Sequence, residues 1–309
     1  MRYSTRVALA ALAAVALGRG VALADGSDPR EDDAFRHRVL LGTGFGATDD
    51  PDGVRLTFTP RLALELRIAP SWRFDARWMV PLLSSPSGNI VDRRTGESRS
   101  DTVPRTGNPT LWIRRAVLRE PSGFDFDLAL GAALPMASIQ QPTPATGPDF
   151  ERAPHTEATY RRALATDGFR RPWLLFWNTA SALLQGYVRQ ETGAVITDLE
   201  LTLGVLIPAG RLRRDPGFVG TISAYTGVRV LGPLELGMRT DLGYTTEQRD
   251  EFDGSLEIEG VQWSFAPEVL LDLGTFSLTA GATVGAGVAI EPFPERANWG
   301  LRLDAAATF

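Results

Sequence analysis

The residues of this sequence that could do chemistry are arginines and carboxylates placed at every second position. The positions between them are apolar, so an extended strand would have one apolar face and one charged face. The candidate set is Arg55, Arg61, Glu65, Arg67, Arg73, Asp75, Arg77, Asp198, Glu200, Arg239, Asp241, Glu268, Arg302 and Asp304. Guanidinium and carboxylate groups pair with each other and with charged solutes. The pattern therefore indicates ion binding.

Catalytic chemistry has few residues to use. Cysteine is absent, which excludes a cysteine nucleophile, a thiolate metal site and a disulfide scaffold. The two histidines, His37 and His155, leave little room for histidine catalysis or a multi-histidine metal site. We therefore expect no enzyme activity, no cofactor and no metal. Asp49, Asp50 and Asp52 could bind calcium, although such an acidic run is also typical of a hairpin turn.

Long strands must position the charged residues. From Val54 to Ile68 every even position is apolar or Pro60, a pattern long enough for a tilted strand that crosses a bilayer. Twelve segments are expected as strands: 35–47, 54–68, 72–83, 110–120, 124–137, 173–188, 195–207, 218–231, 234–247, 258–272, 276–290 and 298–309. Two are weak. Arg114 and Arg115 put a charge on each face of one, and the stretch from Trp173 to Leu184 is apolar on both faces and could be a helix.

The connections between these segments alternate in length. Residues 69–71, 121–123, 232–233 and 274–275 are tight turns, whereas 84–108 and 138–171 are long polar loops. Tight turns at one rim and long loops at the other are typical of outer-membrane barrels. We therefore expect an all-β fold: a single antiparallel up-and-down transmembrane β-barrel of about twelve strands, with short periplasmic turns and long extracellular loops.

The N-terminal segment predicts export. Arg2 and Arg6 precede the apolar run Val7–Leu17, which is too short to span a bilayer, and Ala22-Leu23-Ala24 fits a cleavage site. We expect a signal peptide at 1–24, a short periplasmic segment at 25–34 and the barrel at 35–309; a buried N-terminal helix is the alternative. Removal of the signal peptide would take away Arg2, Arg6 and Arg19 and change the net charge from −5 to −8. Such an acidic chain disfavours nucleic acid as a partner.

The last segment, 298–309, is apolar at its odd positions and ends on Phe309. With the export signal and the strand array, it resembles the outer-membrane β-barrel proteins of Gram-negative bacteria. The resemblance implies localisation in the cell outer membrane, contact with its lipid and lipopolysaccharide, and recognition of Phe309 by the barrel-assembly machinery. Aromatic girdles are expected at both membrane interfaces, formed by Trp72, Phe124, Phe276, Phe309, Phe218, Tyr244, Trp263 and Trp299.

A narrower resemblance rests on Gly107-Asn108-Pro109-Thr110-Leu111 and on the strand from Phe124 to Pro135. These segments look like those of the outer-membrane transporters linked to aromatic meta-cleavage pathways, which implies transport of small hydrophobic molecules. The sequence departs from that pattern at Asn108, where the family has aspartate. It departs again at Pro135-Met136-Ala137, where the family has proline-threonine-glycine.

Three further motifs have two readings each. Gly42, Gly44 and Gly46 could form a nucleotide-binding loop, but a turn follows them instead of a helix, so glycines that relieve crowding in a barrel strand explain them better. His155 lacks the serine two residues away that outer-membrane phospholipases have, since Thr156 and Glu157 follow it. The arginine pairs 93–94, 161–162, 170–171 and 213–214 should lie on the extracellular side, either contacting lipopolysaccharide or solvated.

The sequence favours a passive outer-membrane channel for a small solute. Five inward arginines on the two strands 54–68 and 72–83 face only Glu65 and Asp75, an excess that should attract anions. The charges could alternatively pair into a network that fills and closes the barrel. A lipid-hydrolysing membrane enzyme and a closed structural or adhesive barrel are the other hypotheses.

Overall fold

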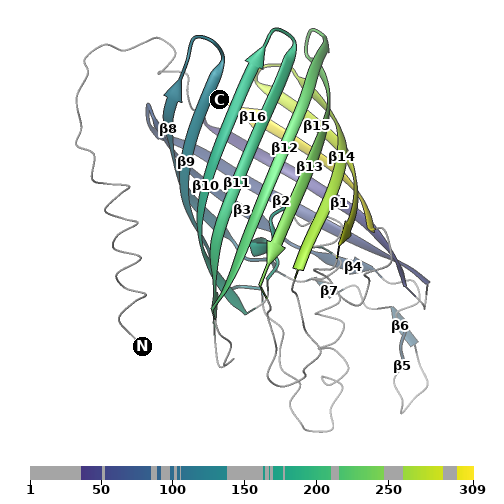
Figure 1. The fold of residues 1–309 in the computed structure, drawn as a ribbon. Coiled ribbons are helices and arrows are strands. Elements are labelled where there is room, and N and C mark those ends of the chain that lie inside the picture. Colours follow the sequence, from purple (N-terminus) through teal and green to yellow (C-terminus); the bar gives the residue numbers. More distant parts are fainter. Residues whose placement is uncertain are drawn as a thin grey trace, which may run out of the picture.

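A computed structural model of the chain shows a closed antiparallel β-barrel (Figure 1). It describes residues 36–50, 53–84, 89–91, 98–100, 103–104, 106–137, 163, 167, 170–176, 178–209, 216–246, 260–287 and 298–309. The predicted signal peptide, the segment 25–34 and His155 lie outside these residues. Within the described ranges, no helix has the length and apolar character needed to cross a membrane.

The barrel wall has twelve strands, as the sequence predicts. They are β1 (Arg38–Asp50), β2 (Gly53–Ala69), β3 (Trp72–Met79), β8 (Thr110–Arg119), β9 (Phe124–Ala133), β10 (Thr179–Thr192), β11 (Val195–Pro208), β12 (Gly217–Leu231), β13 (Leu234–Thr245), β14 (Gly260–Asp272), β15 (Phe276–Gly287) and β16 (Asn298–Thr308). Each strand pairs with its chain neighbours, and β1 also pairs with β16, which closes the barrel. Closure leaves the wall without an unpaired edge.

The two rims differ in the length of their connections. Five tight turns, after β2, β8, β10, β12 and β14, lie at one rim, where Arg38 also pairs with Thr308 (Figure 1). We call this the tight-turn rim. Glycines at positive φ, among them Gly193 at 62° and Gly274 at 84°, allow the chain to reverse there. The opposite rim receives the long connections and is called the long-loop rim.

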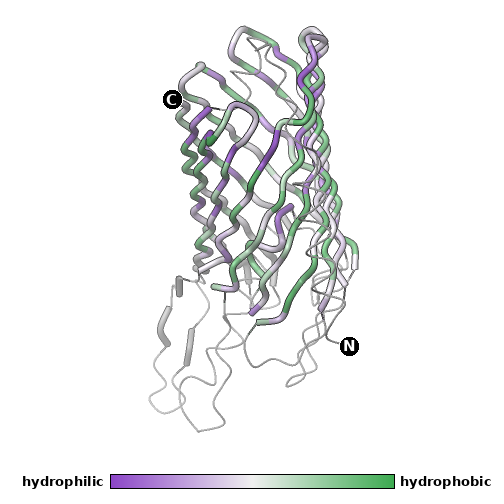
Figure 2. Tube along the Cα trace, turned by 90° about the vertical axis from the view of Figure 1, so that its left-hand side faces the viewer, coloured by the Kyte–Doolittle hydropathy of each residue, from purple (hydrophilic) through white to green (hydrophobic). Residues whose placement is uncertain are grey.

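Side chains alternate between the two faces of the wall. Leu203 of β11 is 52% exposed on the outside, whereas its neighbour Thr202 is fully buried inside. Figure 2 shows the same alternation of hydrophobic and hydrophilic residues along the strands. Aromatic residues predicted as girdle members are exposed on the outside: Phe218, Tyr244, Trp263, Trp299, Phe276 and Phe309. Apolar outside and polar inside is the arrangement of a barrel whose solvent is lipid.

The strand predicted at 72–83 is shorter than expected. β3 ends at Met79, and after Pro81 the chain forms β4 (Leu82–Ser84), which pairs with β2 and with β7 (Val103–Pro104). Proline has no N–H to donate to the ladder, which accounts for the interruption. The predicted loop 84–108 also contains β5 (Asn89–Val91) paired with β6 (Ser98–Ser100).

The strand predicted at 173–188 is wrong at its start. Residues Pro172–Leu174 form a short 3₁₀ turn, η1, with all three side chains buried, and β10 begins at Thr179. The stretch is apolar on both faces because it leaves the wall and packs inside the barrel. Period-two analysis detects wall strands and has no means to recognise a segment folded into the lumen.

Candidate functional site

Arginines and carboxylates of β2, β3, β8 and β9 form a connected network on the inner wall. Arg73 Nε lies 2.5 Å from Asp75 Oδ1, and Arg73 also pairs with Glu65 at 3.1 Å. Arg114 joins this group at 3.6 Å from Asp75 and reaches Asp127 at 3.8 Å. Asp75 is fully buried, so its charge is balanced by these neighbours rather than by bulk water.

A second network lies across β13, β14 and β16. Glu268 accepts hydrogen bonds from Arg239 at 3.0 Å and from Arg302 at 2.7 Å, and Arg302 also pairs with Asp304 at 3.1 Å. The two guanidinium groups of this network are therefore balanced by two carboxylates, Glu268 and Asp304.

Glycines let large side chains lie flat against the wall. The Tyr225 ring covers Gly227 and Gly237, and its hydroxyl donates to Glu235 Oε1 at 2.6 Å. A Cβ at Gly44 would lie 2.8 Å from Arg61 Nη2, so Arg61 crosses β1 where that strand has no side chain. The prediction that glycines of β1 relieve crowding is confirmed at Gly42, which faces Asp304, and at Gly44.

Asn108 ties a loop segment into the barrel. Its side-chain nitrogen donates to the carbonyl oxygens of Trp173 at 3.0 Å, Phe176 at 2.6 Å and Thr179 at 3.3 Å. Its Oδ1 accepts from the Ala137 N–H at 2.7 Å. Asn108 is fully buried, and these bonds use both ends of its amide. Residues 170–176, here called the inward segment, are thereby held at the long-loop rim.

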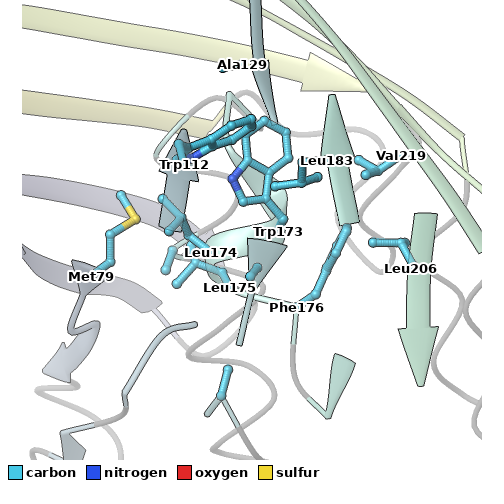
Figure 3. Packing of buried hydrophobic residues seen from close by; sticks show 13 residues of the cluster. Met79, Trp112, Ala129, Trp173, Leu174, Leu175, Phe176, Leu183, Leu206 and Val219 are labelled. Carbon is cyan, nitrogen blue, oxygen red and sulfur yellow. The ribbon is translucent and has the colours of Figure 1, made fainter. Parts of the chain in front are cut away.

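An apolar cluster anchors the same segment from the other side (Figure 3). Trp173 meets the inward-facing Trp112 of β8 edge-on, with ring centroids 6.2 Å apart. The cluster comprises Met79, Trp112, Ala129, Ala133, Ala137, Ala163, Trp173, Leu174, Leu175, Phe176, Leu183, Leu206 and Val219. All are nearly inaccessible, so the segment is packed as firmly as a protein core.

Charged residues near the inward segment reach opposite walls. Asp167 accepts a hydrogen bond from Arg61 of β2 at 2.6 Å, while Arg170 Nε lies 4.0 Å from Asp241 Oδ1 of β13. Arg170 and Arg171 line a cavity inside the barrel, so the prediction that this pair contacts lipopolysaccharide or is solvated on a loop surface is wrong. The other three arginine pairs lie outside the described residues.

A cavity of about 310 Å³ lies inside the barrel. Its charged lining is Arg38, Arg61, Arg77, Arg170, Arg171, Arg189, Arg239, Arg302, Glu65, Asp198, Glu235, Glu268 and Asp304, eight arginines against five carboxylates. A second cavity of about 610 Å³ adjoins it at Arg38, Glu65, Tyr187 and Arg189. The charged lining of this second cavity is Arg38, Arg73, Arg114, Arg119, Arg189, Glu65, Glu120, Asp125, Asp127, Glu191 and Glu200.

Most of the site residues expected from the sequence line these cavities or the networks beside them. Arg67 lies at a bulge where its N–H donates to His37 Nδ1 at 3.2 Å, and Asp198 lies 3.6 Å from Arg189. The side chain of Arg55 is outside the described part of the structure. In the part of the chain that is described, no three His, Asp or Glu residues are grouped to hold a metal ion.

Sequence reasoning missed several lumen residues. Arg119 is one: a bulge between Ala116 and Leu118 shifts the alternation by one residue, so both Arg114 and Arg119 face inward. Arg119 then pairs with Asp127 at 2.6 Å. Arg189 was missed because the strand was predicted to end at residue 188, and Tyr187 was missed because only charged residues were sought on the inner face. Arg38 was missed because it stands alone at the start of β1.

The sequence matches no protein-family model and no curated protein. Solved structures do share its architecture. The COG4313 outer membrane channel from Pseudomonas putida F1 is 12% identical, with a TM-score of 0.57 over 92% of this chain and 100% of that chain. The NanC porin is 7% identical, with a TM-score of 0.50 over 88% of this chain and 100% of that one. The fold is that of an outer-membrane β-barrel.

Proposed function

We propose that the protein is a passive channel of the bacterial outer membrane, which carries a small solute through its arginine-lined lumen. The adjoining cavities of about 310 and 610 Å³ carry this proposal, because together they supply charged space from below the inward segment to the tight-turn rim. Two solved structures with the same fold are described as an outer membrane channel and a porin, which supports the same function.

The smaller cavity, of about 310 Å³, is called the inner cavity below, and its charge favours anions. Eight arginines and five carboxylates line it, and a low-dielectric wall strengthens the field of the excess positive charge. The larger cavity, of about 610 Å³ at the tight-turn rim, has five arginines and six carboxylates, so it is close to neutral. Selection between anions and cations should therefore take place in the inner cavity.

Localisation in the outer membrane follows from the exposed apolar band on the outside of the wall. Leu201 and Leu203 of β11 and Leu301 and Leu303 of β16 are all about half exposed there. Such a band is stable in hydrocarbon and would aggregate in water. Arginine and carboxylate side chains dominate the charged lining of both cavities, so we propose a channel rather than an enzyme.

A closed barrel is the competing function, favoured by the ion pairs and the inward segment that occupy the lumen. Single-channel recording of the refolded protein in a planar bilayer separates the two. The channel proposal expects discrete conductance steps in KCl. Folded barrel, verified by its shifted mobility in unheated gel samples, that inserts without conducting would support the closed barrel instead.

A further inference from the structure

Arg171 differs from four of the other arginines that line the inner cavity. Arg61, Arg189, Arg239 and Arg302 each have a carboxylate oxygen within 3.0 Å. No hydrogen bond or ion pair joins the Arg171 side chain to any residue that the structure describes, and its Nε is buried without a partner. Burial lowers the pKa of the Arg171 guanidinium, and its neighbours Arg170 and Arg77 lower it further. Arg171 is partly buried and thus lacks a close anion to balance its charge.

Arg77 of β3 is a wall arginine with a similar deficit. Its contacts with carboxylates are long, 3.9 Å to Asp75 and 4.0 Å to Glu65, and both acids have a closer partner in Arg73. Arg77 and Arg171 line the same cavity. Two guanidinium groups of like charge, neither closely paired, form a position where an oxyanion would be stabilised by both.

Glu200 of β11 is the carboxylate that acts most strongly on Arg171, since its charge raises the pKa of the Arg171 guanidinium against the lowering by burial, Arg170 and Arg77. The two side chains nevertheless line different cavities, Arg171 the smaller and Glu200 the larger, and no ion pair joins them within the described residues. Glu200 therefore competes with an incoming anion for Arg171 without occupying its hydrogen-bond donors.

We infer that Arg171, carried into the lumen by the inward segment, forms with Arg77 a binding site for a small oxyanion, a carboxylate or a phosphate, on the solute pathway. This inference rests on the proposed function. It gives the inward segment a role other than closure. Asn108 and the apolar cluster around Trp173 hold the segment in place, and Arg170 faces Asp241. Arg171, the next residue, can therefore contact the solute.

The test compares Arg171→Gln with Arg115→Gln in planar bilayers. Arg115 loses the same charge but faces outward, where its guanidinium lies 5.5 Å from the Trp72 ring. We expect Arg171→Gln to reduce the chloride-to-potassium permeability ratio by about fivefold, the Boltzmann weight of a unit charge at about 4 Å in water. Arg115→Gln should keep the wild-type ratio, and Arg171→Lys should keep most of it.

Binding is measured by adding potassium acetate or potassium phosphate to a fixed KCl solution and recording the fall in single-channel current. We expect acetate, phosphate or both to block wild type, and the half-blocking concentration to rise in Arg171→Gln and to fall in Glu200→Gln. Block by acetate alone identifies a carboxylate site, and block by phosphate alone a phosphate site. Absence of block by both in a conducting wild type would overturn the inference and leave the channel function standing.

Stability separates binding from a structural role. Arg171→Gln removes a buried, unpaired charge beside two arginines, so the urea midpoint of unfolding should stay level or rise. Arg170→Gln removes the partner of Asp241 and should lower that midpoint. A lower midpoint for Arg171→Gln together with unchanged selectivity would make Arg171 structural and contradict the inference. A wild type that never conducts would instead remove the proposed function itself.

Discussion

Asp167 accepts a hydrogen bond from Arg61 at 2.6 Å, although 106 residues separate them in the sequence. Arg61 stands on the arginine-rich side of the barrel, and Arg170, three residues after Asp167, faces Asp241 on the other side. The loop thus carries an acid toward Arg61 of β2 and a base toward Asp241 of β13. This charge complementarity orients the segment across the lumen.

Replacing Asp167 should loosen that arrangement. Asp167→Asn removes a charge-assisted hydrogen bond to a mostly buried guanidinium, which is worth about 1.5–3 kcal/mol. We expect the free energy of unfolding in urea to fall by that order. Arg61→Gln and the double variant complete a mutant cycle. Additive effects of the two single changes would show that the contact contributes no coupling.

Asn108 offers a test of what holds the inward segment in place. Asn108→Asp keeps the shape and the acceptor for the Ala137 N–H but removes the donors to the carbonyls of Trp173, Phe176 and Thr179. Each buried polar group left unsatisfied costs about 1–3 kcal/mol. We expect faster proteolysis within the loop 134–178 and larger fluctuations of the open-channel current. If the variant kept the protease resistance and current noise of the wild type, Asn108 would not be what holds the inward segment in place.

The outward face can be tested at Leu203. Leu203→Arg places a charge on the exposed apolar band of β11 and should cost about 2–4 kcal/mol of stability if that position lies near the bilayer midplane. Leu203→Ala is the matched control and should cost less. Folding titrations into lipid vesicles measure both, and equal stabilities would mean that this face does not meet lipid.

Phe309 is expected to act in assembly. Its N–H donates to the His37 carbonyl at 3.0 Å, and its ring lies 6.0 Å from the His37 ring at the tight-turn rim. Deleting Phe309 removes the terminal aromatic that the resemblance assigns to the assembly machinery. We predict a reduced yield of heat-modifiable barrel in outer-membrane fractions, and an unchanged yield would reject the assignment.

The alternation of side chains was sufficient to predict the strands of the barrel wall but not the residues that fill the lumen. β2 and β11 were predicted within a few residues, because an apolar face in lipid enforces strict period two. Arg119 was missed because a bulge changes the period by one residue, which no local pattern reveals. The inward segment was missed because its environment is set by Asn108 and Trp112, more than sixty residues away.

The zero-current potential of the refolded wild type across a KCl gradient tests the central claim most directly. A lumen whose inner cavity has eight arginines and five carboxylates should pass chloride more readily than potassium, so the potential should have the sign of an anion-selective pore. Arg77→Gln should move it toward zero. A potential of the cation-selective sign, or folded barrels that carry no current, would contradict the account.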